Sequence, residues 1–167
     1  MAHEIAVYPG TFDPLTLGHL DLIERSAKVF KRVVVAVAAT TSKAGTIFPL
    51  EERMALVRGA VAEAGVTGVE VEPLDGLLVD WCERRGIGIV VRGLRAYSDF
   101  EYEFQMALTN RQLNPRIETL FLMPNEEHSY ITASMVREVA RLGGRTSDFT
   151  PPSVARRITE WQKAGGK

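Results

Sequence analysis

Short runs of valine, isoleucine and other apolar residues alternate along the chain with longer segments in which apolar residues recur every three or four positions. The short runs have the length and the β-branched content of strands that are buried on both faces. They predict strands at Ile5–Tyr8, Val33–Ala38, Val69–Val71, Ile87–Val91 and Thr119–Leu122. The longer segments predict helices at residues 18–30, 50–64, 76–85, 97–113, 132–142 and 152–163.

This alternation predicts an α/β fold with a five-stranded parallel sheet and helices on both faces. In the helix expected at 97–113, one face should pack on the sheet, and it carries Phe100, Phe104, Ala107, Leu108 and Arg111. The prolines at 151 and 152 are interpreted as a helix boundary, so residues 1–167 are expected to form a single domain. Ligands of such sheets bind beyond the carboxyl ends of the strands, where the chemistry is expected.

The charge balance argues against a nucleic-acid partner. Lysine and arginine number 20, aspartate and glutamate number 21, and the formal net charge is −1, so the chain has no net positive field for a polyanion. The apolar fraction of 46% and the charged fraction of 25% are ordinary for a soluble protein.

Cysteine content and the absence of long apolar runs bear on the compartment. Cys82 is the only cysteine, so no intramolecular disulfide can form, and a zinc site would have to combine it with His3, His19 and His128. We assign no metal-binding residues. The first residues lack the features of a secretory signal, and no apolar run approaches the roughly 18 residues of a spanning helix. We expect a cytoplasmic protein without a membrane partner.

The first predicted strand runs into a turn-rich segment, residues 8–19, with two glycines and two prolines before a helix begins. Backbone N–H groups at a helix start favour phosphate, and Gly10 and Gly18 would let the backbone approach a ligand closely. His19, in the first helical turn, could donate a hydrogen bond to a phosphate oxygen. The alternative is a tight turn in which His19 only caps the helix.

Cationic residues follow two other predicted strands. Lys43 ends a loop of small residues, and Arg92 and Arg95 follow the fourth strand directly. At the carboxyl edge of the sheet, all three could bind phosphates. Lys43 could instead be an ordinary solvated charge. The two arginines could instead form ion pairs with the carboxylates that follow in the sequence, which are Asp99, Glu101 and Glu103.

A second helix start, near residues 129–137, has hydroxyl groups and an arginine but no acidic residue. An uncompensated positive helix end with hydroxyl donors suits a phosphate tail. Ordinary N-capping by Thr132 or Ser134 would explain the same pattern.

Two motifs, Gly10-Thr11-Phe12-Asp13-Pro14 and Thr16-Leu17-Gly18-His19, resemble the signature of the nucleotidyltransferase superfamily, in which the matching histidine stabilises the phosphate being transferred. Together with Arg92–Arg95, Asp99–Glu103 and Phe121–Pro124, they resemble the bacterial phosphopantetheine adenylyltransferases over nearly the whole chain. The resemblance implies a Rossmann-like domain that transfers AMP from ATP to 4'-phosphopantetheine in coenzyme A biosynthesis. It also implies Mg²⁺ with ATP, a homohexamer, and feedback inhibition by coenzyme A.

The resemblance also implies contacts for individual residues. Those expected at phosphopantetheine are Thr11, Lys43, Leu78 and Arg92. Those expected at ATP are Thr11, Phe12, His19, Gly93, Leu94, Arg95, Glu103, His128, Ser129, Tyr130, Ile131, Thr132, Ala133 and Ser134. Three positions depart from the family pattern: Leu17 replaces an asparagine, His128 an aromatic residue, and Ala133 a serine. Because Ala133 has no hydroxyl, the phosphate role is assigned more readily to Ser134.

The expected mechanism is a direct in-line attack of the acceptor phosphate on the α-phosphorus of ATP, with release of pyrophosphate. The catalytic set is His19, Lys43, Arg92 and Arg95, which would stabilise developing negative charge. Two alternatives stay open. The acceptor could be nicotinamide mononucleotide or, with CTP, glycerol phosphate, or the chain could be a non-catalytic nucleotide sensor on the same fold.

Overall fold

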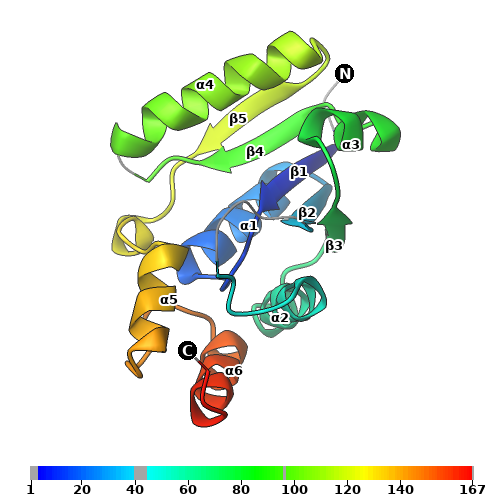
Figure 1. The fold of residues 1–167 in the computed structure, drawn as a ribbon. Helices are drawn as coiled ribbons and strands as arrows, with labels where there is room; N and C mark the ends of the chain where they lie inside the picture. Colours follow the sequence, from blue (N-terminus) through cyan, green and yellow to red (C-terminus); the bar gives the residue numbers. More distant parts are fainter. Residues whose placement is uncertain (1–3, 40–44, 96, 167) are drawn as a thin grey trace.

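Five parallel strands form the centre of the computed structural model, which describes residues 4–39, 45–95 and 97–166 (Figure 1). The strand order is β3-β2-β1-β4-β5. The strands are β1 (Ile5–Gly10), β2 (Arg32–Ala38), β3 (Val69–Leu74), β4 (Ile89–Gly93) and β5 (Glu118–Leu122). The helices are α1 (Leu17–Val29), α2 (Leu50–Glu63), α3 (Leu78–Arg85), α4 (Tyr97–Leu113), α5 (Ala133–Arg141) and α6 (Pro152–Lys163), with a 3₁₀ turn η1 (Glu126–His128).

The prediction of an α/β fold with a five-stranded parallel sheet is confirmed. Several predicted boundaries move by one to three residues: β1 and β3 extend to Gly10 and Leu74. β4 begins at Ile89, not Ile87, because the Ile87 N–H bonds to the Cys82 carbonyl and closes the end of α3. The turn η1 was not predicted, since three residues carry no usable periodicity.

Helices cover both faces of the sheet, as predicted. Alternate residues of a strand point to opposite faces, so Tyr8 and Val35 enter one core while Val7 and Val34 enter the other. The first core includes apolar residues of α1, α2, α5 and α6, and the second is closed by α3, whose Trp81 is fully buried. The central strands β1 and β2 are therefore buried on both sides, which explains the apolar start of β1 and the valine-rich run of β2.

Helix α4, which runs alongside β5 (Figure 1), is oriented opposite to the prediction. Phe100, Phe104 and Leu108 were expected to pack on the sheet, but each is about half exposed, and the two phenylalanine rings stack with centroids 5.6 Å apart. Its buried residues are polar, Glu103 and Asn110. A helical period locates an apolar stripe but does not say which surface covers it, so the prediction was wrong in direction.

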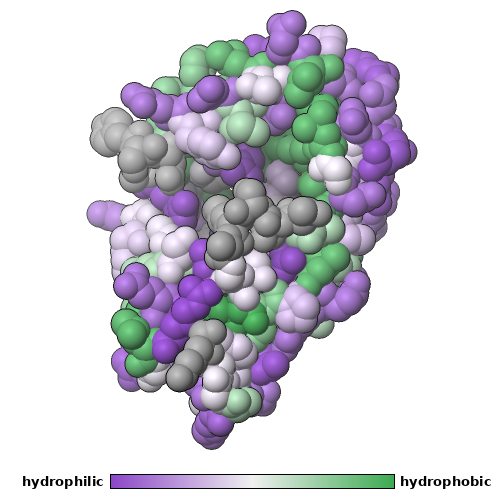
Figure 2. Space-filling view, viewed as in Figure 1, coloured by the Kyte–Doolittle hydropathy of each residue, from purple (hydrophilic) through white to green (hydrophobic). Residues whose placement is uncertain are grey.

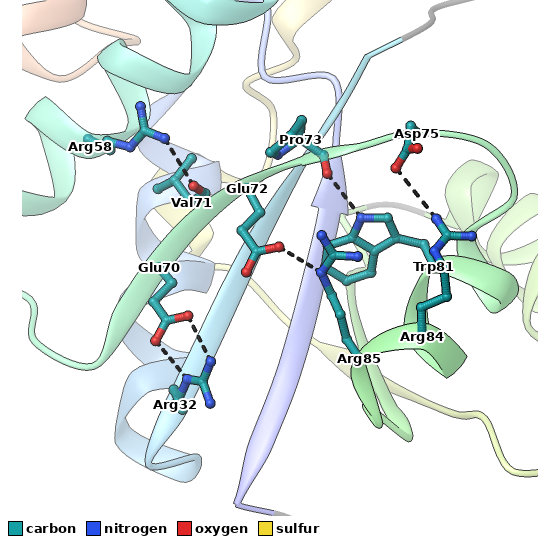
Figure 3. Close-up of polar contacts among 10 residues, drawn as sticks. All are labelled: Arg32, Arg58, Glu70, Val71, Glu72, Pro73, Asp75, Trp81, Arg84 and Arg85. Carbon is teal, nitrogen blue, oxygen red and sulfur yellow. Dashed lines mark hydrogen bonds and ion pairs between the residues drawn. The ribbon is translucent and has the colours of Figure 1, made fainter.

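Ion pairs tie the edge strand β3 to its neighbours (Figure 3). Arg32 of β2 forms a forked pair with Glu70, at 2.7 and 2.9 Å, and Arg85 of α3 donates to Glu72 at 2.6 Å. The Trp81 indole donates to the Pro73 carbonyl at 3.0 Å. Exposed pairs of this kind contribute about 0–1 kcal/mol each, but charged side chains discourage an edge strand from pairing with another chain. The bonds of Arg85 and Trp81 also join α3 to β3.

In the part of the chain that the structure describes, no helix is both long enough and apolar enough to cross a membrane.

Candidate active site

A cleft of about 530 Å³ opens beyond the carboxyl ends of β1 and β4. The chain passes from β1 to β2 and β3 on one side of the sheet and then returns to place β4 on the other side of β1, so these two strands flank a topological switch point. Figure 2 shows the opening as a hollow near the middle of the face. Its volume is that of a small-molecule site, and residues of the β1–α1 loop, β4, α4 and α5 line it.

His19 is held at the start of α1 by reciprocal hydrogen bonds with Thr16, the N-cap residue. The Thr16 N–H donates to His19 Nδ1 at 3.1 Å, and the His19 N–H donates to Thr16 Oγ1 at 3.2 Å. Because Nδ1 accepts a hydrogen bond, a neutral imidazole in this arrangement carries its proton on Nε2. The capping role that we considered as the alternative is therefore present, and it also orients the ring that lines the cleft.

Phe12 has an uncommon backbone conformation, with φ at +49°, and its ring is only 2% exposed. The ring packs edge-to-face on Tyr8 and His19, with centroid distances of 5.4 and 5.1 Å. A Cβ on Gly10 would lie 2.9 Å from the same ring. Gly10 therefore makes room for Phe12, and both Gly10 and Gly18 also line the cleft.

Arg92, at the end of β4, is joined to Glu103 of α4 by a forked ion pair. Arg92 Nε donates to Glu103 Oε2 at 2.7 Å, Nη2 donates to Oε1 at 2.6 Å, and Nη1 donates to the Pro9 carbonyl at 2.9 Å. The ion pair considered as an alternative for Arg92 is thus formed with Glu103. Both residues still line the cleft, so the pair fixes the guanidinium at its wall.

Arg92 itself and the buried Tyr8 next to it have shifted pKa values. Burial lowers the pKa of Arg92, but the hydrogen bonds and charge of Glu103 outweigh it and raise the pKa above its ordinary value. Burial raises the pKa of the Tyr8 phenol far above its ordinary value, although the charges of Arg92 and Arg95 act in the opposite direction. At neutral pH Arg92 is therefore a cation and Tyr8 a neutral hydroxyl.

Two further arginines connect the segments around the cleft. Arg95 Nη1 donates to the Ile131 carbonyl at 3.2 Å, which joins the end of β4 to the segment before α5. Arg137 of α5 donates to the Asp13 carbonyl at 2.6 Å and to Ser134 Oγ at 3.0 Å. Cations from β4, its following loop and α5 thus border one opening that can hold several phosphate groups.

The structure brings most of the predicted site residues together. Those that line the cleft are Thr11, Phe12, His19, Leu78, Arg92, Gly93, Arg95, Glu103, Ile131, Thr132, Ala133 and Ser134. Four others do not: Leu94, whose N–H bonds to the Leu122 carbonyl, and His128, Ser129 and Tyr130, which lie at and after η1. Lys43 falls outside the described residues.

Sequence reasoning did not assign several lining residues, of which Tyr102, Met106, Asn110 and Arg137 are the most informative. Asn110 lies seven positions after Glu103 and therefore on the same helix face, a spacing that could have identified it. Arg137 was noted only as an arginine in the helix start near residues 129–137, and its spacing of three from Ser134 predicts the contact observed.

Comparison with known proteins gives a consistent picture. Residues 7–139 match the model of the cytidylyltransferase-like family. A phosphopantetheine adenylyltransferase of Alkalilimnicola ehrlichii is 55% identical over 155 residues, covering 92% of this chain and 88% of that protein. One of Stenotrophomonas maltophilia is 53% identical over 160 residues, covering 96% and 93%.

Solved structures share the fold at lower sequence identity. A bifunctional NMN adenylyltransferase/ADP ribose pyrophosphatase from Francisella tularensis aligns with a TM-score of 0.76 at 16% identity, covering 96% of this chain and 50% of that one. A putative nicotinate-nucleotide adenylyltransferase from Vibrio parahaemolyticus aligns with a TM-score of 0.70 at 19% identity, covering 93% and 91%. At these identities the likeness concerns the fold alone.

Proposed function

The chain belongs to the cytidylyltransferase-like family and, within it, to the phosphopantetheine adenylyltransferases, and we propose that its cleft is the site of adenylyl transfer. The enzyme transfers AMP from ATP to 4'-phosphopantetheine, giving dephospho-coenzyme A and pyrophosphate. The observation that carries the assignment of the site is the convergence of His19, Arg92 and Arg95 on one cleft at the switch point of the sheet.

The transfer is a direct displacement. An oxygen of the acceptor phosphate attacks the α-phosphorus of ATP, and the bond from that phosphorus to the bridging oxygen of pyrophosphate breaks. Such reactions depend on positioning and on donors aimed at developing negative charge. We assign Arg92 to the acceptor phosphate, Arg95 to the ATP phosphates and the Nε2–H of His19 to the phosphate being transferred. Lys43 is assigned to the same electrostatic set from the resemblance.

The cleft also offers a surface for the uncharged arm of the acceptor. Leu74, Leu78 and Met106 line it from the β3–α3 turn and α4. The buried Asn110 adds a polar group among them. Apolar walls with a few fixed polar groups suit an elongated amide-containing chain, which supports phosphopantetheine over a second nucleotide as the acceptor.

We propose that Mg²⁺ enters with ATP. The described residues contain no group of three or more histidine, cysteine, aspartate or glutamate side chains placed to hold a metal. Mg²⁺ is commonly held through substrate phosphates, water and one or two carboxylates. The ion would therefore be carried mainly by the triphosphate of ATP. When bound, the ion would neutralise charge on the leaving pyrophosphate.

We propose a homohexamer, and the outward stripe of α4 supports it. Phe100, Phe104 and Leu108 form an apolar row on the exposed side of the helix, with Leu113 at its end. A helix that turns its apolar side away from its own core is expected to be covered by another surface. A second copy of the chain is the occupant that a homohexamer provides.

Coenzyme A is proposed as a feedback inhibitor because it carries the same pantetheine arm and would compete for the cleft. We expect the reaction to take place in the cytoplasm. The only cysteine, Cys82, is a buried free thiol, which is compatible with a reducing compartment.

The function is tested by measuring pyrophosphate release with pairs of substrates. ATP with 4'-phosphopantetheine should release pyrophosphate, whereas ATP with nicotinamide mononucleotide, or CTP with glycerol phosphate, should give only background rates. Preference for another pair would reassign the acceptor. ATP binding with no pyrophosphate release for any acceptor would identify a sensor instead.

A further inference from the structure

A buried arginine that does not line the cleft bonds to two residues that do. Arg53 of α2 is only 3% exposed. Its guanidinium donates to three backbone carbonyls, those of Thr11 at 2.7 Å, Ala38 at 3.0 Å and Phe48 at 3.1 Å. These carbonyls belong to the β1–α1 loop, the end of β2 and the segment that precedes α2, so one side chain joins three segments.

Asp13 completes this arrangement from the β1–α1 loop. Its carboxylate is fully buried and accepts from the N–H groups of Ile47 and Phe48 at 2.8 and 2.9 Å. Its main-chain carbonyl accepts from Arg137, which lines the cleft. The Asp13 and Arg53 side chains therefore bond to the same short segment, residues 47–48, from two sides.

Stability alone is a weak explanation for these buried charges. No carboxylate of a described residue lies within ion-pair distance of Arg53, and burial lowers its pKa, with the charge of Asp13 only partly opposing this. Burying a charge is unfavourable, and a well-packed apolar side chain is often at least as stabilising at such a position. What an apolar residue cannot do is fix the direction of three carbonyl groups at once.

The direction of the Thr11 carbonyl has a consequence for the cleft. In a trans peptide the carbonyl and the following N–H point in opposite directions, and the Thr11–Phe12 peptide is not among the cis bonds. With its carbonyl held toward Arg53, this peptide directs the Phe12 N–H away from α2. Thr11 and Phe12 both line the cleft.

We propose that Arg53 is a positioning residue for adenylyl transfer, which holds the Thr11 carbonyl so that the Phe12 N–H faces the phosphates of ATP. Asp13 assists by holding residues 47–48 against the same loop. Arg53 touches no reacting atom and acts through the backbone. This inference rests on the proposed function, because it names the ligand that the N–H would meet.

The test compares two conservative substitutions on the same helix. Lysine keeps the charge of Arg53 but lacks the fork that reaches three carbonyls. We expect R53K to lower kcat/KM for ATP roughly a hundredfold, since small misplacements of a site have effects of that size. R58K is the matched control, because Arg58 is exposed and its bond among the described residues is to the Val71 carbonyl in the edge strand β3. This variant should keep wild-type kcat and KM.

A purely structural role makes a different prediction. It would lower the urea midpoint of R53K while leaving kcat and KM of the folded enzyme unchanged, and that outcome would overturn the proposal. Should R53K fail to fold, the wild-type enzyme still provides a test: the amide ¹⁵N–¹H signal of Phe12 should shift strongly when α,β-methylene ATP is added. An unshifted Phe12 signal in an enzyme that releases pyrophosphate normally would reject this inference and leave the proposed function intact.

Discussion

The Arg92 side chain shows how an internal ion pair and a substrate contact can coexist. A guanidinium has five N–H donors, and the observed bonds to Glu103 and Pro9 use one on Nε, one on Nη1 and one on Nη2. Counting bonds within the described part of the chain, one N–H on each terminal nitrogen remains for an acceptor phosphate. Glu103, which the resemblance assigned to ATP, is placed to orient Arg92.

This arrangement predicts strong coupling between the two residues. R92K and E103Q should each lower kcat/KM for phosphopantetheine, and the double variant should lose much less than the product of the two effects. The expected coupling energy is about 1–3 kcal/mol, as for residues in one hydrogen-bond network. A double-mutant cycle of steady-state kinetics measures it. If the two effects are additive and E103Q changes only the KM for ATP, Glu103 contacts ATP and does not orient Arg92.

The buried thiol of Cys82 should make the free energy of unfolding depend on pH in the alkaline range. Its side chain is fully buried, and burial raises the thiol pKa from 9.0 to about 11, with Arg85 opposing. The unfolded chain therefore loses this proton before the folded chain does, so the stabilisation is complete below about pH 9 and is lost as the pH rises toward 11. The loss is about 2–3 kcal/mol. In urea unfolding, wild type should lose stability relative to C82A between pH 8 and pH 10.5. An equal difference between the two proteins at both pH values would contradict the raised thiol pKa.

At the level of helices and strands, β4 and α1 pack closely next to the cleft. Gly93 ends β4, and a Cβ there would lie 2.4 Å from Leu22 Cδ1 of α1. The glycine therefore sets how closely the Arg92 strand approaches the His19 helix.

G93A should accordingly destabilise the fold by about 1–3 kcal/mol through overpacking. Adding L22A should recover part of that loss, because it removes the atom that the new methyl group meets. G59A is the control: Gly59 is inside α2 with its nearest neighbour at an ordinary 3.9 Å, so alanine should be neutral or stabilising by up to about 1 kcal/mol. Chemical denaturation measures all four proteins. A G93A variant as stable as G59A would show that the junction is loose.

The strands and helices could be predicted because the period of apolar residues reports which residues are buried. The valine run of β2 is buried on both faces, as its composition indicated. The period of apolar residues does not show which surface covers the apolar stripe of a helix. For that reason the prediction placed the wrong side of α4 against the sheet. Its polar residues Glu103 and Asn110 face the cleft, which no local pattern distinguishes from a solvated face.

At the scale of the whole molecule, the exposed apolar row of Phe100, Phe104 and Leu108 on α4 allows a test of the proposed hexamer. Phe104 is 48% exposed, and F104E should break the proposed subunit contact by placing a charge in an apolar interface. Light scattering should then change from six times the chain mass to a smaller species. Leu142, at 81% exposure after α5, is the control, and L142E should keep the wild-type mass. If F104E and L142E have the same mass as wild type, the row is not an interface.

The site was predictable to the extent that parallel strands end at a common edge. Residues at and beyond the carboxyl ends of β1 and β4, among them His19, Arg92 and Arg95, could be placed together from the sequence because of this topology. Arg53 could not, since it reaches the loop next to the cleft from a helix, through bonds to backbone carbonyls. Contacts of that kind depend on how helices pack, which a single sequence does not show.

The most direct measurement of the central claim is the turnover of H19A with both substrates at saturation. The variant should remain folded, because the bond from the residue 19 N–H to Thr16 Oγ1, which caps the helix, comes from the backbone and not from the imidazole. Its kcat should fall roughly a hundredfold or more, the usual consequence of removing a donor aimed at developing charge. Near-normal turnover by the folded, saturated variant would remove His19 from the mechanism and contradict the cleft as the place of adenylyl transfer.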